Sequence, residues 1–135
     1  MRGIVANIER ATHLIDIELG RRLAALEITQ AEAHVLARLG RGGPTSPSEL
    51  HRLFGHKRST LTGILDRLEE RRWITRELDP ADRRSFVVSL TGPGKTAAAK
   101  VVAAVDALER RVARRVAGRD LEGFAAVLAA LEPGR

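Results

Sequence analysis

The sequence has no cysteine and no tyrosine, and its aromatic side chains are three phenylalanines and one tryptophan. Without cysteine the chain has no disulfides, no thiolate nucleophile, no zinc–thiolate site and no cysteine redox sensor. So few aromatic residues disfavour a surface on which single-stranded bases would stack. These absences exclude cysteine-dependent enzymes and sensors and disfavour a binder of single strands.

Long apolar runs are missing as well. No run approaches the roughly 18 consecutive apolar residues of a membrane span. The start, "MRGIVANIERATHLIDIE", carries acids where a signal peptide would be apolar. We therefore expect a cytoplasmic protein without a membrane partner.

Chain length predicts the number of domains, and net charge indicates the kind of partner. A chain of 135 residues predicts one domain, 1–135. The 23 Lys and Arg residues outnumber the 17 Asp and Glu residues, and the net charge of +6 indicates an anionic partner. Among the possible anionic partners, we favour nucleic acid over an anionic membrane surface. The membrane is disfavoured because the basic residues are spread along the chain and acids lie near the apolar stripes.

Apolar periodicity and capping signals predict helices at both ends and in the centre of the chain. Spacings of three or four predict a long helix over 4–26 and two helices after the capping stretch "LTGPG". Two capping boxes and two glycine stops bound the central helices. The capping signals are Thr29 with Glu32 and Gly42-Gly43 for the first, and Ser46 with Pro47, Glu49 and Gly55 for the second. The C-terminal stripes are Val101, Val105, Leu108, Val112, Val116 and Leu121, Phe124, Leu128, Leu131.

The stretch "KRSTLTGILDRLEERRW" predicts a further helix with two unlike faces. Leu61, Ile64, Leu65 and Leu68 fall on the apolar face, and the opposite face carries Ser59, Thr62, Gly63 and Asp66, with Arg58, Thr60 and Arg67 at its edges. "WITREL" and "SFVVSL" follow as short strands, the second alternating Phe86, Val88 and Leu90 with smaller or polar residues. The charged loop Asp79–Arg84 joins them as a hairpin.

Two helices joined by the tight turn "FGHK" and followed by a hairpin predict a winged helix-turn-helix. A helix fits the major groove of DNA when its outer face is small and polar at the centre and basic at the edges. "KRSTLTG", with Lys57 and Arg58 at its start, meets that description. Arg83 and Arg84 at the tip of the hairpin reach the minor groove or its phosphates, where the potential is most negative. The neighbouring acids Asp79 and Asp82 would fix the orientation of these arginines.

The segments "ITQAEAHVLARL", "TSPSELHRLF", "KRSTLTGILDRLEERRWITREL" and "DPADRRSFVVSLTGPG" together resemble the MarR family of bacterial transcriptional regulators. The most specific match is the wing signature D-x-R, a short strand and L-T-x-x-G, carried here by Asp82, Arg84, Leu90-Thr91 and Gly94. The resemblance covers about 28–94. It implies a mainly α fold with a small β-hairpin wing, in which 29–91 binds DNA and the helices of 1–28 and 92–135 form a dimer.

The resemblance also implies a function and roles for single residues. It predicts a homodimeric repressor that binds double-stranded DNA at a pseudo-palindromic operator and is released by a small-molecule effector. Asp82 resembles the family's wing acid, which pairs with a helix arginine, here Arg67, and braces the wing. Ser59, Thr60 and Thr62 would lie in the major groove and Arg84 in the minor groove. The full set of predicted DNA-binding residues is Lys57, Arg58, Ser59, Thr60, Thr62, Arg67, Arg83 and Arg84.

Two positions depart from the family's pattern. Gly63 stands where many relatives carry a base-reading arginine, which would weaken direct readout or shift it to Arg58 and Arg67. Arg72 stands where relatives often have the glycine that ends the recognition helix. Arg71 and Arg72 nevertheless suit a helix C-terminus electrostatically.

Plainer readings of the same residues remain open. Arg83 and Arg84 are also ordinary turn charges, and the hydroxyl residues of 59–62 also suit a helix cap and a solvated face. A winged helix used for protein contact, docking an acidic partner, is the alternative function. No enzyme is expected, because no cluster of histidine and carboxylate converges. His51 and His56 lack the spacing of a helical metal pair, and we predict neither metal nor cofactor.

Overall fold

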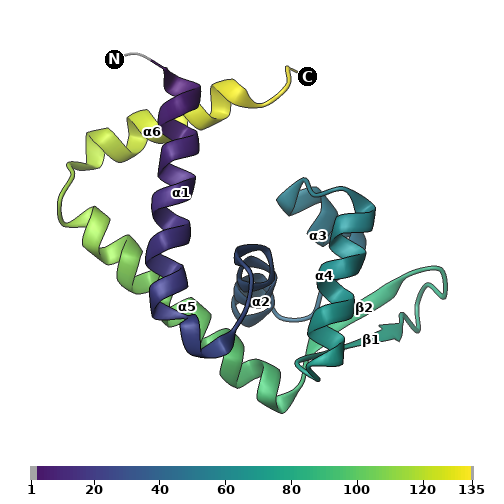
Figure 1. Ribbon diagram of the computed structural model, residues 1–135. Coiled ribbons are helices and arrows are strands. Elements are labelled where there is room, and N and C mark those ends of the chain that lie inside the picture. The colour runs from purple at the N-terminus through teal and green to yellow at the C-terminus, as the bar shows by residue number, and fades with distance from the viewer. Residues whose placement is uncertain (1–2, 135) are drawn as a thin grey trace. The chain divides into compact units, whose positions relative to one another are not determined.

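The computed structural model describes residues 3–134 (Figure 1). The elements are α1 (Ile4–Arg22), the 3-10 helix η1 (Ala24–Leu26), α2 (Gln30–Gly42), α3 (Pro47–Phe54), α4 (Arg58–Glu70), β1 (Ile74–Leu78), β2 (Phe86–Leu90), α5 (Gly92–Ala113) and α6 (Gly118–Leu131). The predicted class, mainly α with a small β-hairpin, is confirmed. Internal contacts divide the chain into two compact units, 1–104 and 105–135, with the boundary inside α5.

The core of the first unit is apolar and draws on every central element. The face predicted for the helix "KRSTLTGILDRLEERRW" is confirmed, since all four of its leucine and isoleucine residues are buried in α4. Burial of such side chains removes apolar surface from water and is the main stabilising contribution. The largest fully buried side chains are Leu36, Leu50, Ile64, Leu68, Ile74, Val35, Val88 and Val101.

The starts of α2 and α3 follow the predicted caps. Thr29 Oγ1 accepts from the backbone N–H of Glu32 at 3.2 Å, and Ser46 Oγ accepts from that of Glu49 at 3.1 Å. Neither start shows the reciprocal bond of a capping box, from the N-cap backbone N–H to the glutamate: at α2 the Thr29 hydroxyl, not its backbone N–H, contacts the Glu32 carboxylate, at 3.0 Å. At α3 the Glu49 carboxylate pairs with Arg52 instead.

The N-terminal helix is shorter than predicted. α1 ends at Arg22, the chain continues through η1, and Glu27 turns it with a left-handed φ of 51°. Only the end of the predicted stripe is buried, at Leu19 and Leu23. Of the other large apolar residues of α1, only Ile8 is half-buried. The exposed ones are Ile4, Val5, Leu14, Ile15 and Ile17.

In the second unit most large apolar residues of α6 are exposed too, and Val127 is half-buried. α5 ends at Ala113, so the predicted stripe member Val116 lies in the turn that follows it. The exposed large apolar residues here are Val112, Val116, Leu121, Phe124, Leu128 and Leu131. Their helical spacing was predicted, and their exposure is a finding of the structure.

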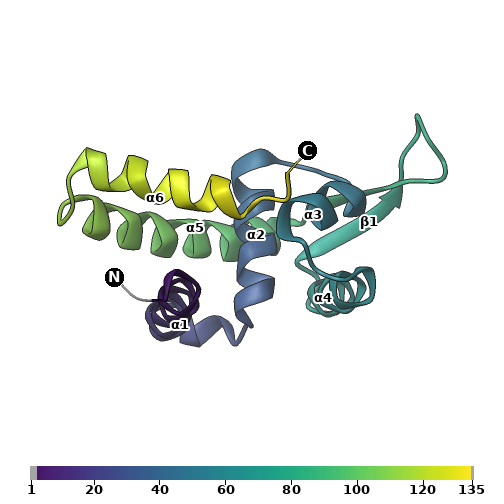
Figure 2. The same cartoon turned by 90° about the horizontal axis from the view of Figure 1, so that it is seen from above.

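The hairpin is antiparallel, with Ile74 opposite Leu90 at its base and Leu78 opposite Phe86 at its outer end. Thr45 adds an isolated bridge to Val88, with backbone hydrogen bonds of 3.1 and 2.7 Å. Val88 is fully buried, whereas Phe86 is 46% exposed. The predicted alternation therefore buries Val88 in the middle of β2 and leaves Phe86 exposed, because the outer end of the hairpin projects beyond α3 and α4 (Figure 2).

The junction after α4 is the most constrained turn of the first unit. Arg72 has a left-handed φ of 60°, and its N–H donates to Glu69 while that of Trp73 donates to Leu68. This is a Schellman motif, whose left-handed position is usually glycine. The Thr91 hydroxyl then donates to the Arg72 carbonyl at 2.6 Å.

The contacts of Gly94 explain why the L-T-x-x-G signature ends in glycine. Its N–H donates to Thr91 Oγ1 at 3.0 Å, so Thr91 caps the start of α5. A Cβ on Gly94 would lie 1.8 Å from the carbonyl oxygen of Trp73. Only glycine lets the start of α5 approach the end of the α4–β1 turn this closely.

Arg72→Gly should stabilise the protein, because other residues carry a penalty of about 1–2 kcal/mol in the left-handed conformation. Added freedom of the unfolded chain offsets part of this gain, leaving about 0.5–1 kcal/mol in the free energy of unfolding. Urea denaturation measures the change. Arg72→Ala removes the side chain but keeps the strain, so it is the control. Equal stability of the two variants would contradict the assignment.

Gly94→Ala should cost about 2 kcal/mol or more in the free energy of unfolding, because the backbone must move to admit the methyl group. Gly92→Ala is the matched control, since a Cβ at that position meets no atom within 4 Å. Alanine favours a helix, so the control should be neutral or slightly stabilising. Thermal unfolding of both variants distinguishes close packing at residue 94 from a general effect of glycine replacement.

Candidate nucleic-acid interface

The predicted helix-turn-helix is formed by α3 and α4, joined by 55–57. Gly55 ends α3 with a φ of 66°, which redirects the chain, and Lys57 is the N-cap residue of α4. Leu50 on α3 and Leu61 on α4 are buried. The packing of these two helices holds the outer face of α4 toward solvent.

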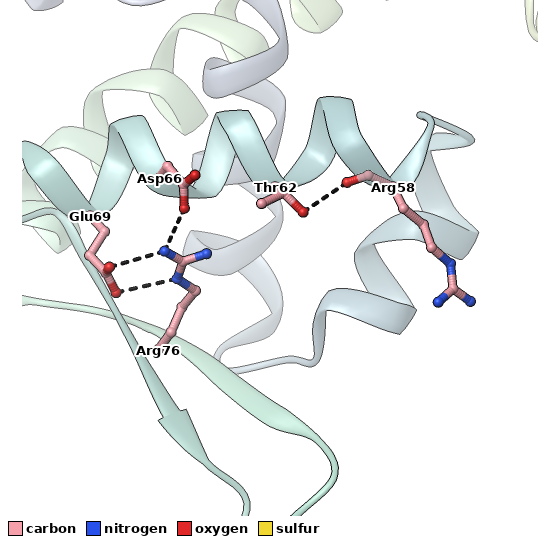
Figure 3. Close-up of polar contacts among 5 residues, drawn as sticks. All are labelled: Arg58, Thr62, Asp66, Glu69 and Arg76. Atoms are coloured by element: carbon pink, nitrogen blue, oxygen red, sulfur yellow. Dashed lines mark hydrogen bonds and ion pairs between the residues drawn. The ribbon is translucent and has the colours of Figure 1, made fainter.

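That outer face is small and polar, as predicted. Arg58, Ser59, Thr60 and Thr62 are all exposed. The Thr62 hydroxyl donates to the Arg58 carbonyl at 2.9 Å (Figure 3), which leaves its oxygen as an acceptor. No side chain caps α4, so Ser59 and Thr60 do not serve as the helix cap that the plainer reading offered.

Arg67 does not pair with Asp82, and this expectation was wrong. Arg67 Nε lies 3.4 Å from Glu32 Oε1 on α2, and Glu32 is only 4% exposed. A buried carboxylate attracts a cation more strongly than one at a solvated loop tip, because water screens it less. Asp82 contacts its own loop instead. The guanidinium of Arg67 therefore ties α4 to α2 rather than to the wing.

Asp82 organises the tip of the hairpin. Its Oδ1 accepts from the backbone N–H of Arg84 at 3.1 Å and lies 3.4 Å from that residue's Nε. These contacts, the backbone bond first, hold the pKa of the Asp82 carboxyl below its ordinary value. The expected orienting role is therefore met by Asp82. Asp79 instead accepts from the N–H of Ala81 at 2.9 Å and shapes the turn.

The arginines of the tip are open to solvent. Arg83 is exposed, and the side chain of Arg84 is 92% exposed despite its contact with Asp82. The loop carrying them forms the far end of the projecting hairpin (Figure 2). A cation held in this way at the end of a ribbon is positioned to contact an anionic partner.

The wing is attached to α4 by an arginine that sequence reasoning missed (Figure 3). Arg76 on β1 donates to Asp66 Oδ1 at 2.6 Å, to Glu69 Oε1 at 3.0 Å and from Nε to Glu69 Oε2 at 3.3 Å. Its hydrogen bonds lower the pKa of Glu69 below the ordinary value. One strand arginine thus bridges two acids of α4, and its single positive charge offsets one of their two negative charges. The i, i+3 spacing of Asp66 and Glu69 indicates that both acids lie on one side of a helix. It does not identify their partner, which depends on the register of the strand that carries Arg76.

Neither a metal site nor a membrane span emerges from the described chain. Over 3–134 no three His, Cys, Asp or Glu side chains gather in a way that could hold a metal ion. No helix in the same range is long and apolar enough to cross a membrane.

Comparison with known proteins finds similar sequences among transcriptional regulators. A family model described as MarR family matches residues 28–86. The HTH-type transcriptional regulator PecS of Dickeya dadantii is 34% identical over 94 residues, which are 67% of this chain and 57% of PecS. The multiple antibiotic resistance protein MarR of Escherichia coli is 33% identical over 63% of this chain and 62% of MarR. The chain spans little more than half the length of the curated relatives it matches.

Solved structures share the fold over nearly the whole chain. A probable transcriptional regulator from Pseudomonas aeruginosa is 27% identical with a TM-score of 0.72, covering 93% of each chain. A mutant MarR from E. coli, complexed with operator DNA, is 24% identical with a TM-score of 0.75, covering 97% of each. At that identity the second likeness shows the fold alone.

Arg76→Gln should loosen the wing, because it removes the ion pairs with Asp66 and Glu69. Trypsin cleavage at Arg83 and Arg84 should then quicken by about two- to fivefold, the size expected for partly exposed ion pairs. Mass spectrometry of the fragments gives the rate at each arginine. Arg115→Gln, in the turn after α5, is the matched control and should leave the wing unchanged. Equal cleavage rates in all three proteins would show that Arg76 does not brace the wing.

Proposed function

The chain belongs to the MarR family, and on that premise we propose that it binds double-stranded DNA through its winged helix and regulates transcription in the cytoplasm. The observation that carries the proposal is the outer face of α4, small and polar at its centre, beside a wing whose tip presents Arg84. A face of this kind fits the major groove. Regulation, not catalysis, is the role proposed.

Contacts in the major groove come from the start of α4. Ser59, Thr60 and Thr62 meet base edges or phosphates, and the acceptor oxygen of Thr62 remains open because its hydrogen is given to Arg58. Lys57 and Arg58 bind phosphates at the edge of the groove. Gly63 offers no side chain for base readout, which shifts that task toward Arg58.

Arg67 has a divided role. Its Nε is engaged by Glu32, yet the side chain is 53% exposed, so its terminal NH groups can donate to a phosphate. A guanidinium held by a buried carboxylate loses little side-chain entropy when it binds. Arg67 would therefore bind DNA and position α4 at the same time.

The wing supplies the second set of contacts. Arg83 and Arg84 would enter the minor groove or bind its phosphates, and Asp82 holds Arg84 before DNA arrives. Phosphate contacts give most of the affinity and make it depend on salt. Specificity would come mainly from the face of α4.

Dimerisation follows from the exposed apolar residues of α1 and of α6, each taken by itself. Contiguous apolar surface of this kind normally marks an interface. We propose a single domain, 1–135, whose ends, 1–28 and 92–135, pair with a second copy; residues 1, 2 and 135 lie outside the described range. A two-fold dimer would place its recognition helices roughly 34 Å apart and prefer an inverted repeat.

Repression with release by a small molecule is the mode of action proposed. A cavity of about 370 Å³ lies between α1, η1 and α2, where Asp16, Leu19, Leu23 and Ala33 contribute to its lining. An occupant releases DNA if it binds better to a dimer whose recognition helices are wrongly spaced for the groove.

The test is fluorescence anisotropy with a duplex selected from a randomised pool, compared with its shuffled sequence over a salt series. Tighter binding of the selected duplex with two chains per site supports the proposal. Equal binding of both duplexes would contradict sequence-specific regulation. Binding of an acidic protein partner, with neither duplex preferred, would favour the protein-docking alternative.

Arg84→Ala should weaken binding of the selected and the shuffled duplex alike, because Arg84 is proposed to meet phosphates and groove potential. The slope of log affinity against log salt should fall by about one. Arg41→Ala, on α2 and outside the predicted DNA contacts and the dimerisation segments, is the control and should keep the slope. An unchanged slope in a folded Arg84→Ala protein would remove Arg84 from the interface.

A further inference from the structure

Arg71, the C-cap residue of α4, reaches across the fold to the connection between α1 and α2. Its Nη1 donates to the Glu27 carbonyl at 2.9 Å and its Nη2 to the Leu26 carbonyl at 2.6 Å. The two carbonyls belong to residues 44 and 45 positions earlier in the chain. The guanidinium also stacks on the Trp73 ring, 3.8 Å from its centroid.

Each of these contacts uses a property particular to arginine. The carbonyls of Leu26 and Glu27 lie at the C-terminal end of η1, where carbonyl groups have no partner within the helix. A planar guanidinium can donate two bonds in its plane while its face covers an aromatic ring. A lysine ammonium would keep the charge but lose the fork and the stacking.

Both ends of this contact are strained. Glu27 and Arg72 are the positive-φ residues other than glycine in the described chain, with φ of 51° and 60°. The left-handed turn at Glu27 ends η1, whose last carbonyls Arg71 binds, and the turn at Arg72 directly follows Arg71. Strained turns persist when surrounding contacts hold them, so the Arg71 bonds stabilise the two turns together.

The α1–α2 connection also lines the cavity between α1, η1 and α2. Ala24, Glu27 and Ile28 are among its lining residues. A movement of this connection therefore changes the position of the carbonyls that Arg71 binds. Because Arg71 is the C-cap residue of α4, the orientation of that helix depends on the same bonds.

We infer that Arg71 is a positioning residue that couples the α1–α2 connection to the recognition helix α4, so that DNA binding and the conformation of residues 24–30 depend on each other. This inference rests on the proposed function. Arg71 acts through the orientation of α4 and makes no contact with DNA. Coupling between two sites is reciprocal, and either end of the link can therefore be observed.

The experiment measures both ends in four full-length proteins: the unmodified chain, Arg71→Gln, Arg71→Lys and the control Arg41→Gln, at the exposed end of α2. Anisotropy with the selected and the shuffled duplex gives affinity and salt slope. Hydrogen exchange with mass spectrometry, with and without the selected duplex, gives the protection of 24–30. Circular dichroism at the assay temperature confirms that each variant is folded.

In the unmodified chain and in Arg41→Gln the selected duplex should slow exchange over 24–30. In Arg71→Gln that protection should disappear and affinity should fall about tenfold, within the usual range of coupling between sites. The salt slope should not change, because no phosphate contact is lost. Arg71→Lys should recover part of the affinity, and it serves the same test if Arg71→Gln does not fold.

Three outcomes would overturn the inference. Equal protection of 24–30 in the unmodified chain and in Arg71→Gln would show that Arg71 transmits nothing. If the unmodified chain binds DNA and exchange over 24–30 does not slow, DNA binding is not coupled to that segment. A salt slope lower by about one in Arg71→Gln would identify a direct phosphate contact. An unmodified chain that binds no duplex would instead overturn the proposed function, and the inference with it.

Discussion

The left-handed turn at Arg72 is the constraint on which the arrangement of the winged helix depends. It ends α4 and turns the chain into β1, and its carbonyl receives the hydroxyl of Thr91 at the start of α5. Gly94 then lies against the carbonyl of Trp73. The recognition helix, the wing and α5 therefore meet within one turn of chain. A residue other than glycine holds that turn because the contacts around it outweigh its local strain.

Features set by neighbours in the chain were predicted from the sequence. Thr29 and Ser46 cap their helices, Gly55 ends α3, and the apolar residues of α4 are buried. Each of these depends on a few adjacent residues, so a local pattern suffices to find it. The same holds for the charged hairpin and its two strands, whose pairing the structure confirms.

Features set by distant residues were not predicted. The partners of Arg67, Arg71 and Arg76 lie on other elements, and each choice depends on how those elements pack. Asp82 was predicted to pair with Arg67 because the family resemblance implies a helix arginine as its partner. The resemblance does not give the local geometry of the loop. The end of α1 at Arg22 and the exposure of Phe86 were not predicted either, since both depend on which surfaces the fold covers.

The ion pairs around the interface also decide which charges face outward. Asp66 and Glu69 are held by Arg76, Glu32 by Arg67 and Asp82 by Arg84. These acids would otherwise repel a phosphate near α4 and the wing. Lys57, Arg58 and Arg83 remain, and the described chain shows no ion pair for them. The four paired acids carry one more charge than the three arginines that hold them, so the positive field at the interface depends on Lys57, Arg58 and Arg83, which lie at the two edges where a DNA backbone would pass.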